Sequence, residues 1–177
     1  MQIQPATFYT SQASEDALII LVNEHDEVIG AKPRNAVELG DMYRGSGLFI
    51  TNHKGQVLLA RRSETKRHNP GTWSVSAGGT LEVGETYESN MIKETQEEIG
   101  LTITNFNKAA YLKLELDTVI FVQLFTATIN SNDLVLTLQE SEVAEAGWWE
   151  IAEIRRALRE EPDQFSVGFS TYFNAVF

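Results

Sequence analysis

The stretch GGTLEVGETYESNMIKETQEEIGL spans residues 78–101 and decides how this chain folds. It opens on a pair of glycines and carries six glutamates against a single lysine. Residues 85–99 contain no glycine or proline and predict a helix. Gly100 ends this helix, because glycine readily adopts the left-handed conformation found after helices. Five of the six glutamates fall in the helix, where like charges repel one another, so their concentration calls for an explanation.

The spacing of the glutamates places three of them on one side of the predicted helix. At about 100° per residue, Glu94 and Glu98 lie one turn apart and Glu97 lies beside them. A neighbouring column at intervals of four residues is expected to face the core, and it consists of Tyr87, Met91, Thr95 and Ile99. The three carboxylates therefore border the buried face of the helix instead of pointing fully away from it.

Crowded carboxylates of this kind are suited to a metal ion. They raise one another's pKa unless a cation lies between them. Oxygen ligands prefer hard divalent ions, so we expect Mg²⁺ or Mn²⁺ to bind at Glu94, Glu97 and Glu98. Because the preceding glycines let the backbone approach closely, the Gly79 carbonyl is expected to be a further ligand. On charge alone, a solvated acidic helix is the commoner explanation, and only the complete pattern overrides it.

That complete pattern resembles the signature of the Nudix hydrolases: Gly, five residues, Glu, seven residues, Arg-Glu, an aliphatic residue, any residue, Glu-Glu, any residue, Gly, aliphatic. In this chain the signature positions are Gly79, Glu85, Lys93, Glu94, Thr95, Glu97, Glu98, Gly100 and Leu101. All six glycine and glutamate positions match, which chance would give in about one such chain in 50,000. Lys93 replaces the family's arginine and keeps its charge without the planar fork. Thr95 replaces an aliphatic residue.

The resemblance implies an α/β fold, a Nudix-type α/β/α sandwich with a mixed sheet. The order of predicted elements, strands then helix then strands then helix, favours the same architecture. We expect a flexible tail over residues 1–16 and a single Nudix domain over residues 17–177, with the Nudix box at 79–101. Helices are expected at 85–99, at 152–160 and near the C-terminus, and a turn at 130–133. Strands are expected at 17–23, 28–34, 47–52, 56–62, 73–79, 101–106, 111–129 and 143–151.

The resemblance extends over about residues 18–160 to the Nudix subgroup that includes isopentenyl-diphosphate isomerase. That enzyme needs a catalytic cysteine where Gly78 stands, and the chain has no cysteine at all. Its metal-binding histidine is replaced by Thr80, and the strand expected to carry a catalytic glutamate reads DTVIFVQLF at residues 117–125, with apolar residues in the matching region. The residues therefore favour hydrolysis over isomerisation.

The activity implied by the resemblance is metal-dependent cleavage of a diphosphate linkage, in a nucleoside diphosphate linked to another group or a similar organic diphosphate. The catalytic residues expected on this basis are Glu98, Glu94, Glu85 and Lys93. In some relatives a general base comes from outside the box, and the nearest residues for that role are Glu140, Glu142 and Glu145. Two alternatives stay open: a non-catalytic module that senses a nucleotide, and an isomerase-like enzyme.

Basic residues cluster in one segment of this acidic chain, at Arg61, Arg62, Lys66 and Arg67. Arginine contacts phosphate through two parallel hydrogen bonds, so we expect Arg61 and Arg62 to bind the substrate's phosphates. The alternative is an ordinary solvated hairpin and loop.

The net charge of −11 argues against a nucleic-acid polymer as a partner, because such proteins present a basic face. No basic segment followed by an apolar run marks a signal peptide, and no apolar run reaches the length of a membrane span. We therefore expect a cytoplasmic protein whose partner is a small phosphorylated substrate and not a membrane. The sequence leaves the oligomeric state open, and a homodimer is one of the states it allows.

Overall fold

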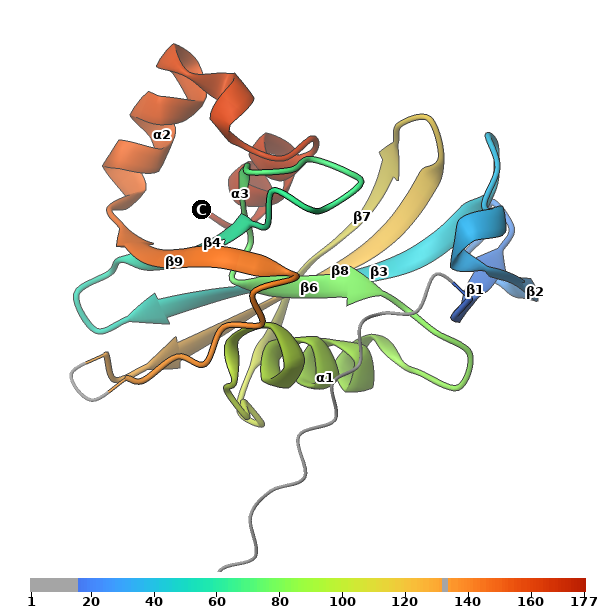
Figure 1. The fold of residues 1–177 in the computed structure, drawn as a ribbon, viewed down its shortest axis with the longest axis horizontal. Coiled ribbons are helices and arrows are strands. Elements are labelled where there is room, and N and C mark those ends of the chain that lie inside the picture. Colours follow the sequence, from blue (N-terminus) through green and yellow to red (C-terminus); the bar gives the residue numbers. More distant parts are fainter. Residues whose placement is uncertain (1–15, 132–133) are drawn as a thin grey trace, which may run out of the picture.

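The computed structural model describes residues 16–131 and 134–177, and it forms three layers (Figure 1). A mixed sheet lies in the middle, with α1 on one face and with α2 and α3 on the other. The helices are α1 (Tyr87–Ile99), α2 (Ile151–Glu160) and α3 (Phe169–Val176). The strands are β1 (Leu18–Val22), β2 (Val28–Pro33), β3 (Met42–Asn52), β4 (Val57–Arg62), β5 (Trp73–Ser74), β6 (Ala77–Thr80), β7 (Asn107–Glu115), β8 (Val119–Ile129) and β9 (Val143–Trp149).

Strand β3 organises the sheet. It runs parallel to β8 along its whole length, from Met42 opposite Val119 to Asn52 opposite Ile129. On its other edge it pairs antiparallel in turn with β1, with β6 and with β4. Because β6 carries the two glycines that open the Nudix box, this pairing fixes the start of the box against the centre of the sheet.

Two apolar cores lie on the two faces of the sheet, because successive side chains of a strand point to opposite faces. Leu48 and Ile50 pack with the α1 side chains Met91 and Ile99. Phe49, between them in sequence, packs on the other face with residues from α2 and α3, namely Ile154, Phe169 and Phe173. Apolar burial on both faces confirms the predicted α/β/α sandwich with a mixed sheet.

Helix α1 follows the predicted pattern closely. Met91, Thr95 and Ile99 are fully buried, as the column at intervals of four predicted. The helix begins two residues later than predicted, because the Thr86 side chain accepts a hydrogen bond from the Ser89 backbone amide and caps the helix. It ends at Gly100, whose φ of 74° is left-handed.

We expect Gly100→Ala to lower the free energy of unfolding by about 2 kcal/mol, since non-glycine residues are strained in this conformation. A Cβ there would also lie only 2.7 Å from the Cβ of Thr137. Gly55→Ala is the matched control, because Gly55 has a φ of +80° but nothing within 4 Å of its Cβ position. Urea unfolding should show the larger loss at Gly100; equal losses would contradict the predicted clash.

The segment after α1 departs from the prediction of a strand at 101–106. Residues 101–106 form no ladder, and the apolar side chains of Leu101, Ile103 and Phe106 cover the core on the α1 face instead. The alternation of apolar and polar residues in this segment reflects burial of its apolar side chains, without pairing to another strand. The run predicted at 111–129 is a hairpin of β7 and β8, closed where the Leu116 amide donates to the Thr118 carbonyl.

The predicted strand at 73–79 is two short strands with different partners. β5 pairs with β4, and β6 pairs with β3. Ser76 lies between them; its hydroxyl accepts from the Ile50 amide and donates to the Leu58 carbonyl. The predicted tail lies, except for Asp16, outside the described residues, as does half of the turn predicted at 130–133. None of the described helices is long and apolar enough to cross a membrane.

Candidate active site

The box glycines and the box glutamates meet where β6 lies against α1. The backbone amide of Gly78 donates a hydrogen bond to Glu98 Oε2 at 3.1 Å. A Cβ built on Gly79 would overlap Glu94 Oε1 and the carboxyl carbon behind it. Glycine is therefore required at Gly79, because the Glu94 carboxylate lies directly on its backbone.

Glu98, which is buried, and Glu94, which is partly buried beside it, form a pair of like charges withdrawn from solvent. Burial raises the pKa of Glu98 well above its usual range, and the nearby charge of Glu94 raises it further. Burial likewise raises the pKa of Glu94; the attraction of Lys93 opposes this shift without cancelling it, and the charge of Glu97 adds to it. Two such carboxylates without a matching cation suit a divalent ion that would neutralise both.

Asn90 holds Glu94 in place, and the sequence prediction did not include it. Its side-chain amide donates to Glu85 Oε2 at 2.9 Å and to Glu94 Oε1 at 3.3 Å. Its carbonyl oxygen accepts from the Ser46 hydroxyl at 2.6 Å, which ties the network to β3. Asn90 is fully buried one turn before Glu94. On the helical wheel Asn90 lies between Glu94 and Glu97, so a neutral amide among the three carboxylates was the available signal.

Lys93, which stands where the signature has arginine, bridges two glutamates. Its Nζ lies 3.0 Å from Glu85 Oε1 and 3.3 Å from Glu82 Oε2. Burial works against its charge, but the hydrogen bond to Glu85 and the charges of Glu85, Glu94 and Glu82 raise its pKa overall. The Glu82 amide donates to the other oxygen of Glu85 at 2.8 Å. Lysine thus fixes Glu85 through a point charge without a planar fork.

The second departure from the signature, Thr95, leaves no polar group unsatisfied. Thr95 is fully buried, and its hydroxyl donates to the Met91 carbonyl one turn earlier at 2.7 Å. A buried hydroxyl with a partner costs little, so a threonine fits this aliphatic position.

Glu97 does not join the buried pair. It is half-buried on α1, and its charge reaches Glu94. Across residues 16–131 and 134–177, no three acidic or histidine side chains converge closely enough to form a complete metal site. Mg²⁺ is commonly held by only one or two carboxylates together with water and phosphate oxygens, so the Glu94–Glu98 pair fits that ion without a third carboxylate.

The NUDIX domain family model matches residues 43–168, which is most of the chain. The chain belongs to the Nudix family. An uncharacterised Nudix hydrolase of Pseudomonas aeruginosa is 31% identical over 76% of this chain and 79% of its own length. Isopentenyl-diphosphate Delta-isomerase 2 of Photorhabdus laumondii is 26% identical over 91% of this chain and 93% of its own. A solved Deinococcus radiodurans structure matches with a TM-score of 0.76 at 24% identity, covering 90% of this chain and 99% of that one.

Among these Nudix relatives, the isomerases raise the question of whether Gly78 could be replaced by cysteine. A Cβ at Gly78 would lie 2.5 Å from the Ser46 carbonyl oxygen and 3.1 Å from the Gly47 Cα. Because β6 lies so close to the β3 backbone, no side chain fits at this position unless the strands move apart. The packing of this Nudix domain therefore excludes a cysteine there, in agreement with the sequence.

The basic segment reaches the site through Arg62 and not through Arg61. Arg61 lies between Glu64 and Glu145, at 3.2 and 3.1 Å. Arg62 donates to the His68 carbonyl at 3.1 Å, and it is near enough to Glu98 to lower that carboxyl's pKa against the stronger effect of burial. Of the two arginines predicted to contact phosphate, Arg62 is thus the one beside the buried pair.

Of the three glutamates considered for a base, Glu142 is the one whose charge acts measurably on Glu98. Its charge contributes to the raised pKa of Glu98, after burial and Glu94. The segment before β9 brings it there, because the Gln139 amide donates to the Glu98 carbonyl at 3.0 Å. Glu142 also forms an ion pair with Lys66. Glu145, in contrast, is engaged by Arg61.

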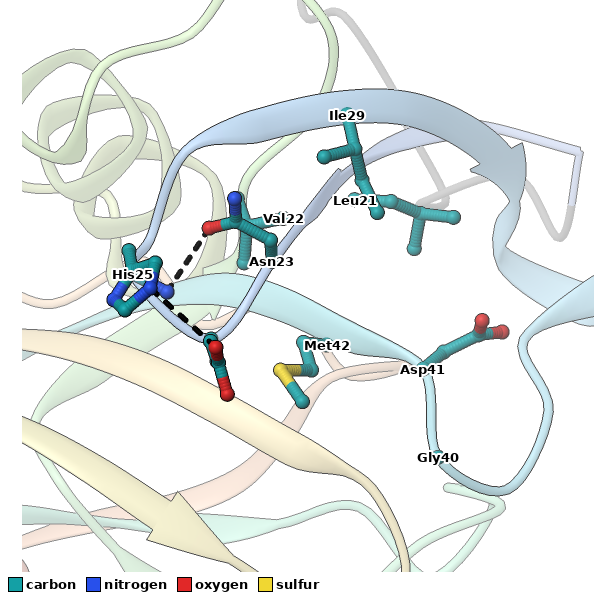
Figure 2. A pocket seen from close by; sticks show the side chains of 9 residues that line it. Leu21, Val22, Asn23, His25, Ile29, Gly40, Asp41 and Met42 are labelled. Atoms are coloured by element: carbon teal, nitrogen blue, oxygen red, sulfur yellow. Dashed lines mark hydrogen bonds and ion pairs between the residues drawn. The ribbon is translucent and has the colours of Figure 1, made fainter.

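A hollow of about 390 Å³ lies away from the box, between the β1–β2 hairpin and the start of β3 (Figure 2). Leu21 and Met42 give it apolar walls. The backbone amide of His25 donates to Asn23 Oδ1 at 2.9 Å, and the His25 ring lies 3.4 Å from Glu24. None of the predicted site residues lines this hollow, so it is separate from the site.

Proposed function

We propose that this protein hydrolyses a diphosphate linkage, in a nucleoside diphosphate linked to another group or a similar organic diphosphate, and that it depends on Mg²⁺ or Mn²⁺. The buried Glu94–Glu98 pair against Gly78 and Gly79 is the observation that carries the proposal. These two carboxylates would hold the ion, and the Gly79 carbonyl and Glu97 are the further ligands we propose. When bound, the ion supplies neutralisation of phosphate charge and makes water a better nucleophile.

The chain's own residues would hold the reactants in place. Asn90 fixes the orientation of Glu94 and also bonds Glu85, which Lys93 holds in turn, and the Gly78 amide fixes Glu98. Arg62 would contact a phosphate of the substrate. Glu142 would take a proton from the attacking water as the water oxygen bonds to phosphorus. The bridging P–O bond breaks at the same centre, and its electron pair and a proton go to the leaving oxygen.

The proposal makes a small phosphorylated molecule the partner, with no nucleic-acid polymer or membrane involved, in the cytoplasm. The bridged position of Lys93 between Glu82 and Glu85 supports a working catalytic helix over a purely sensing module. A homodimer is compatible with the proposal, which needs only one chain.

The test is a panel of nucleoside di- and triphosphates, nucleotide sugars, dinucleotides and prenyl diphosphates, each incubated with the purified protein and Mg²⁺ or Mn²⁺. We expect phosphate-containing products from at least one compound, and we expect EDTA to abolish their formation because the two carboxylates repel a diphosphate unless a cation lies between them. Restoring the metal should restore turnover. Turnover that survives EDTA would contradict the metal dependence, and tight binding without turnover would favour the sensing module.

A further inference from the structure

A pocket of about 160 Å³ lies on the α3 face of the sheet, with the β6 backbone between it and the carboxylates of α1. Gly78 and Gly79 line it, and these are the residues whose backbone touches Glu98 and Glu94. In the described residues β6 pairs only with β3, so its other edge is not covered by a strand. A molecule seated in the pocket would therefore have its diphosphate within reach of the carboxylates across a single peptide segment.

The pocket exists because β3 carries glycines where side chains would fill it. A Cβ built on Gly45 would contact the Gly79 carbonyl oxygen at 3.4 Å, and Ile120 and Val122 at 3.4 and 3.8 Å, all of them in residues that line the pocket. A Cβ on Gly47 would contact Val75, another lining residue, at 3.7 Å. The described residues that line it are glycine, serine, threonine, valine, isoleucine and tyrosine, with no charged residue among them. An interior of this kind excludes a charged group, because desolvating one without a partner is costly.

Tyr172 closes the pocket from the C-terminal helix α3. Burial, with a smaller effect of Tyr43, raises the pKa of Tyr172 to about 12, so its hydroxyl keeps its proton at neutral pH. This hydroxyl has no hydrogen-bond partner among residues 16–131 and 134–177. The Tyr43 hydroxyl, in contrast, accepts from Thr118 at 3.2 Å. A half-buried donor without a partner on a pocket wall suits an oxygen of a ligand.

We infer that this pocket selects the substrate, by admitting the organic group of the diphosphate only when that group is compact and uncharged. The inference rests on the hydrolysis proposed above and specifies its substrate class. Gly45 and Gly47 provide the space, Tyr172 limits its length, and the Tyr172 hydroxyl donates to an oxygen of the group or of its ester link. Long chains and nucleotides exceed the space.

The experiment compares three diphosphates: isopentenyl diphosphate, whose group is compact and uncharged, farnesyl diphosphate, whose group is uncharged but long, and ADP-ribose. For the unaltered protein with Mg²⁺ we expect kcat/KM for isopentenyl diphosphate to exceed both others at least tenfold. Gly45→Val should lower it at least tenfold by filling the pocket, and Tyr172→Ala should narrow the gap to farnesyl diphosphate. Tyr172→Phe should cost about fivefold, mainly in KM, as expected for one neutral hydrogen bond.

Matched controls introduce the same kinds of substitution at positions outside the pocket. Gly30→Val adds a side chain on β2 where nothing lies within 4 Å, and Tyr111→Phe removes a hydroxyl that contacts Asp26. Both should leave the preference among the three compounds unchanged. Calorimetry of isopentenyl diphosphate binding gives a second measurement. It tests the pocket without requiring that the compound be hydrolysed.

These measurements distinguish a failure of the pocket inference from a failure of the proposed hydrolysis. Binding that Gly45→Val weakens at least tenfold, without any turnover, would support the pocket while overturning the hydrolysis. Turnover that favours ADP-ribose or farnesyl diphosphate, or that the pocket variants change equally for all three compounds, would overturn the pocket and leave the hydrolysis standing. Variants that unfold at a lower temperature are judged by the ratio between compounds, which a general loss of folded protein does not change.

Discussion

Glu98→Gln is expected to lower kcat/KM for diphosphate hydrolysis by about a thousandfold or more, measured on the best compound of the panel. The change keeps the size of the side chain and removes the charge that a divalent ion would need. The amide oxygen of the substituted side chain can still accept the hydrogen bond from Gly78, so the contact between β6 and α1 should remain. The loss should therefore come from the chemistry and not from the fold.

Thermal unfolding separates these two causes. Without metal, Glu98→Gln should be at least as stable as the unaltered protein, because it removes one of two buried like charges. Mg²⁺ should raise the unfolding temperature of the unaltered protein, since a ligand of the folded state stabilises it, and should do so much less in the variant. An equal Mg²⁺ effect in both proteins would show that Glu98 does not bind the ion.

Glu88→Gln provides the matched control on the same helix. Glu88 lies in the first turn of α1 and pairs with Lys108 at 2.6 Å, on a partly exposed surface. An ion pair of this kind contributes little to stability. Activity should stay within about twofold of the unaltered protein. If Glu88→Gln lowered kcat/KM as strongly as Glu98→Gln, the loss would reflect the total charge of the helix and not one site.

The sequence predicted helix α1 well because its determinants are local. The column of Met91, Thr95 and Ile99 depends only on the helical period, and the end at Gly100 depends on one residue's backbone. The position of Glu94 and Glu98 on the border of the buried face follows from the same period. A local pattern of this strength predicts the helix under almost any tertiary arrangement of the rest of the chain.

The remaining features depend on contacts between distant segments, which a pattern in one segment does not encode. Asn90 matters because Ser46, 44 residues earlier in the chain, meets it across the layers. Glu142 comes near Glu98 because the segment before β9 pairs with the end of α1. Ile103 alternates with polar neighbours like a strand residue, yet it packs in the core on the α1 face, and strand pairing begins only at Asn107. Similarly, the separation of β5 from β6 reflects two different partner strands.

Phe169→Ala is expected to lower the free energy of unfolding by about 3–5 kcal/mol, the largest stability effect we predict. Phe169 is fully buried, and its ring stacks on Phe165 at a centroid distance of 4.8 Å and meets Phe49 edge-on at 6.0 Å. Truncation would remove these contacts and leave a cavity between α3 and the sheet that rigid neighbouring rings fill poorly.

Val167→Ala, two residues earlier, is the control because Val167 is 61% exposed, and it should cost less than about 0.5 kcal/mol in urea unfolding. A loss below about 1 kcal/mol at Phe169 would mean that α3 is only loosely attached to the sheet. That result would also bear on substrate selection, because Tyr172 lies one turn further along the same helix. A rigid Phe169 anchor is what would let Tyr172 set the length limit of the pocket, so the stability that depends on Phe169 and the specificity that depends on Tyr172 should rest on the same packing.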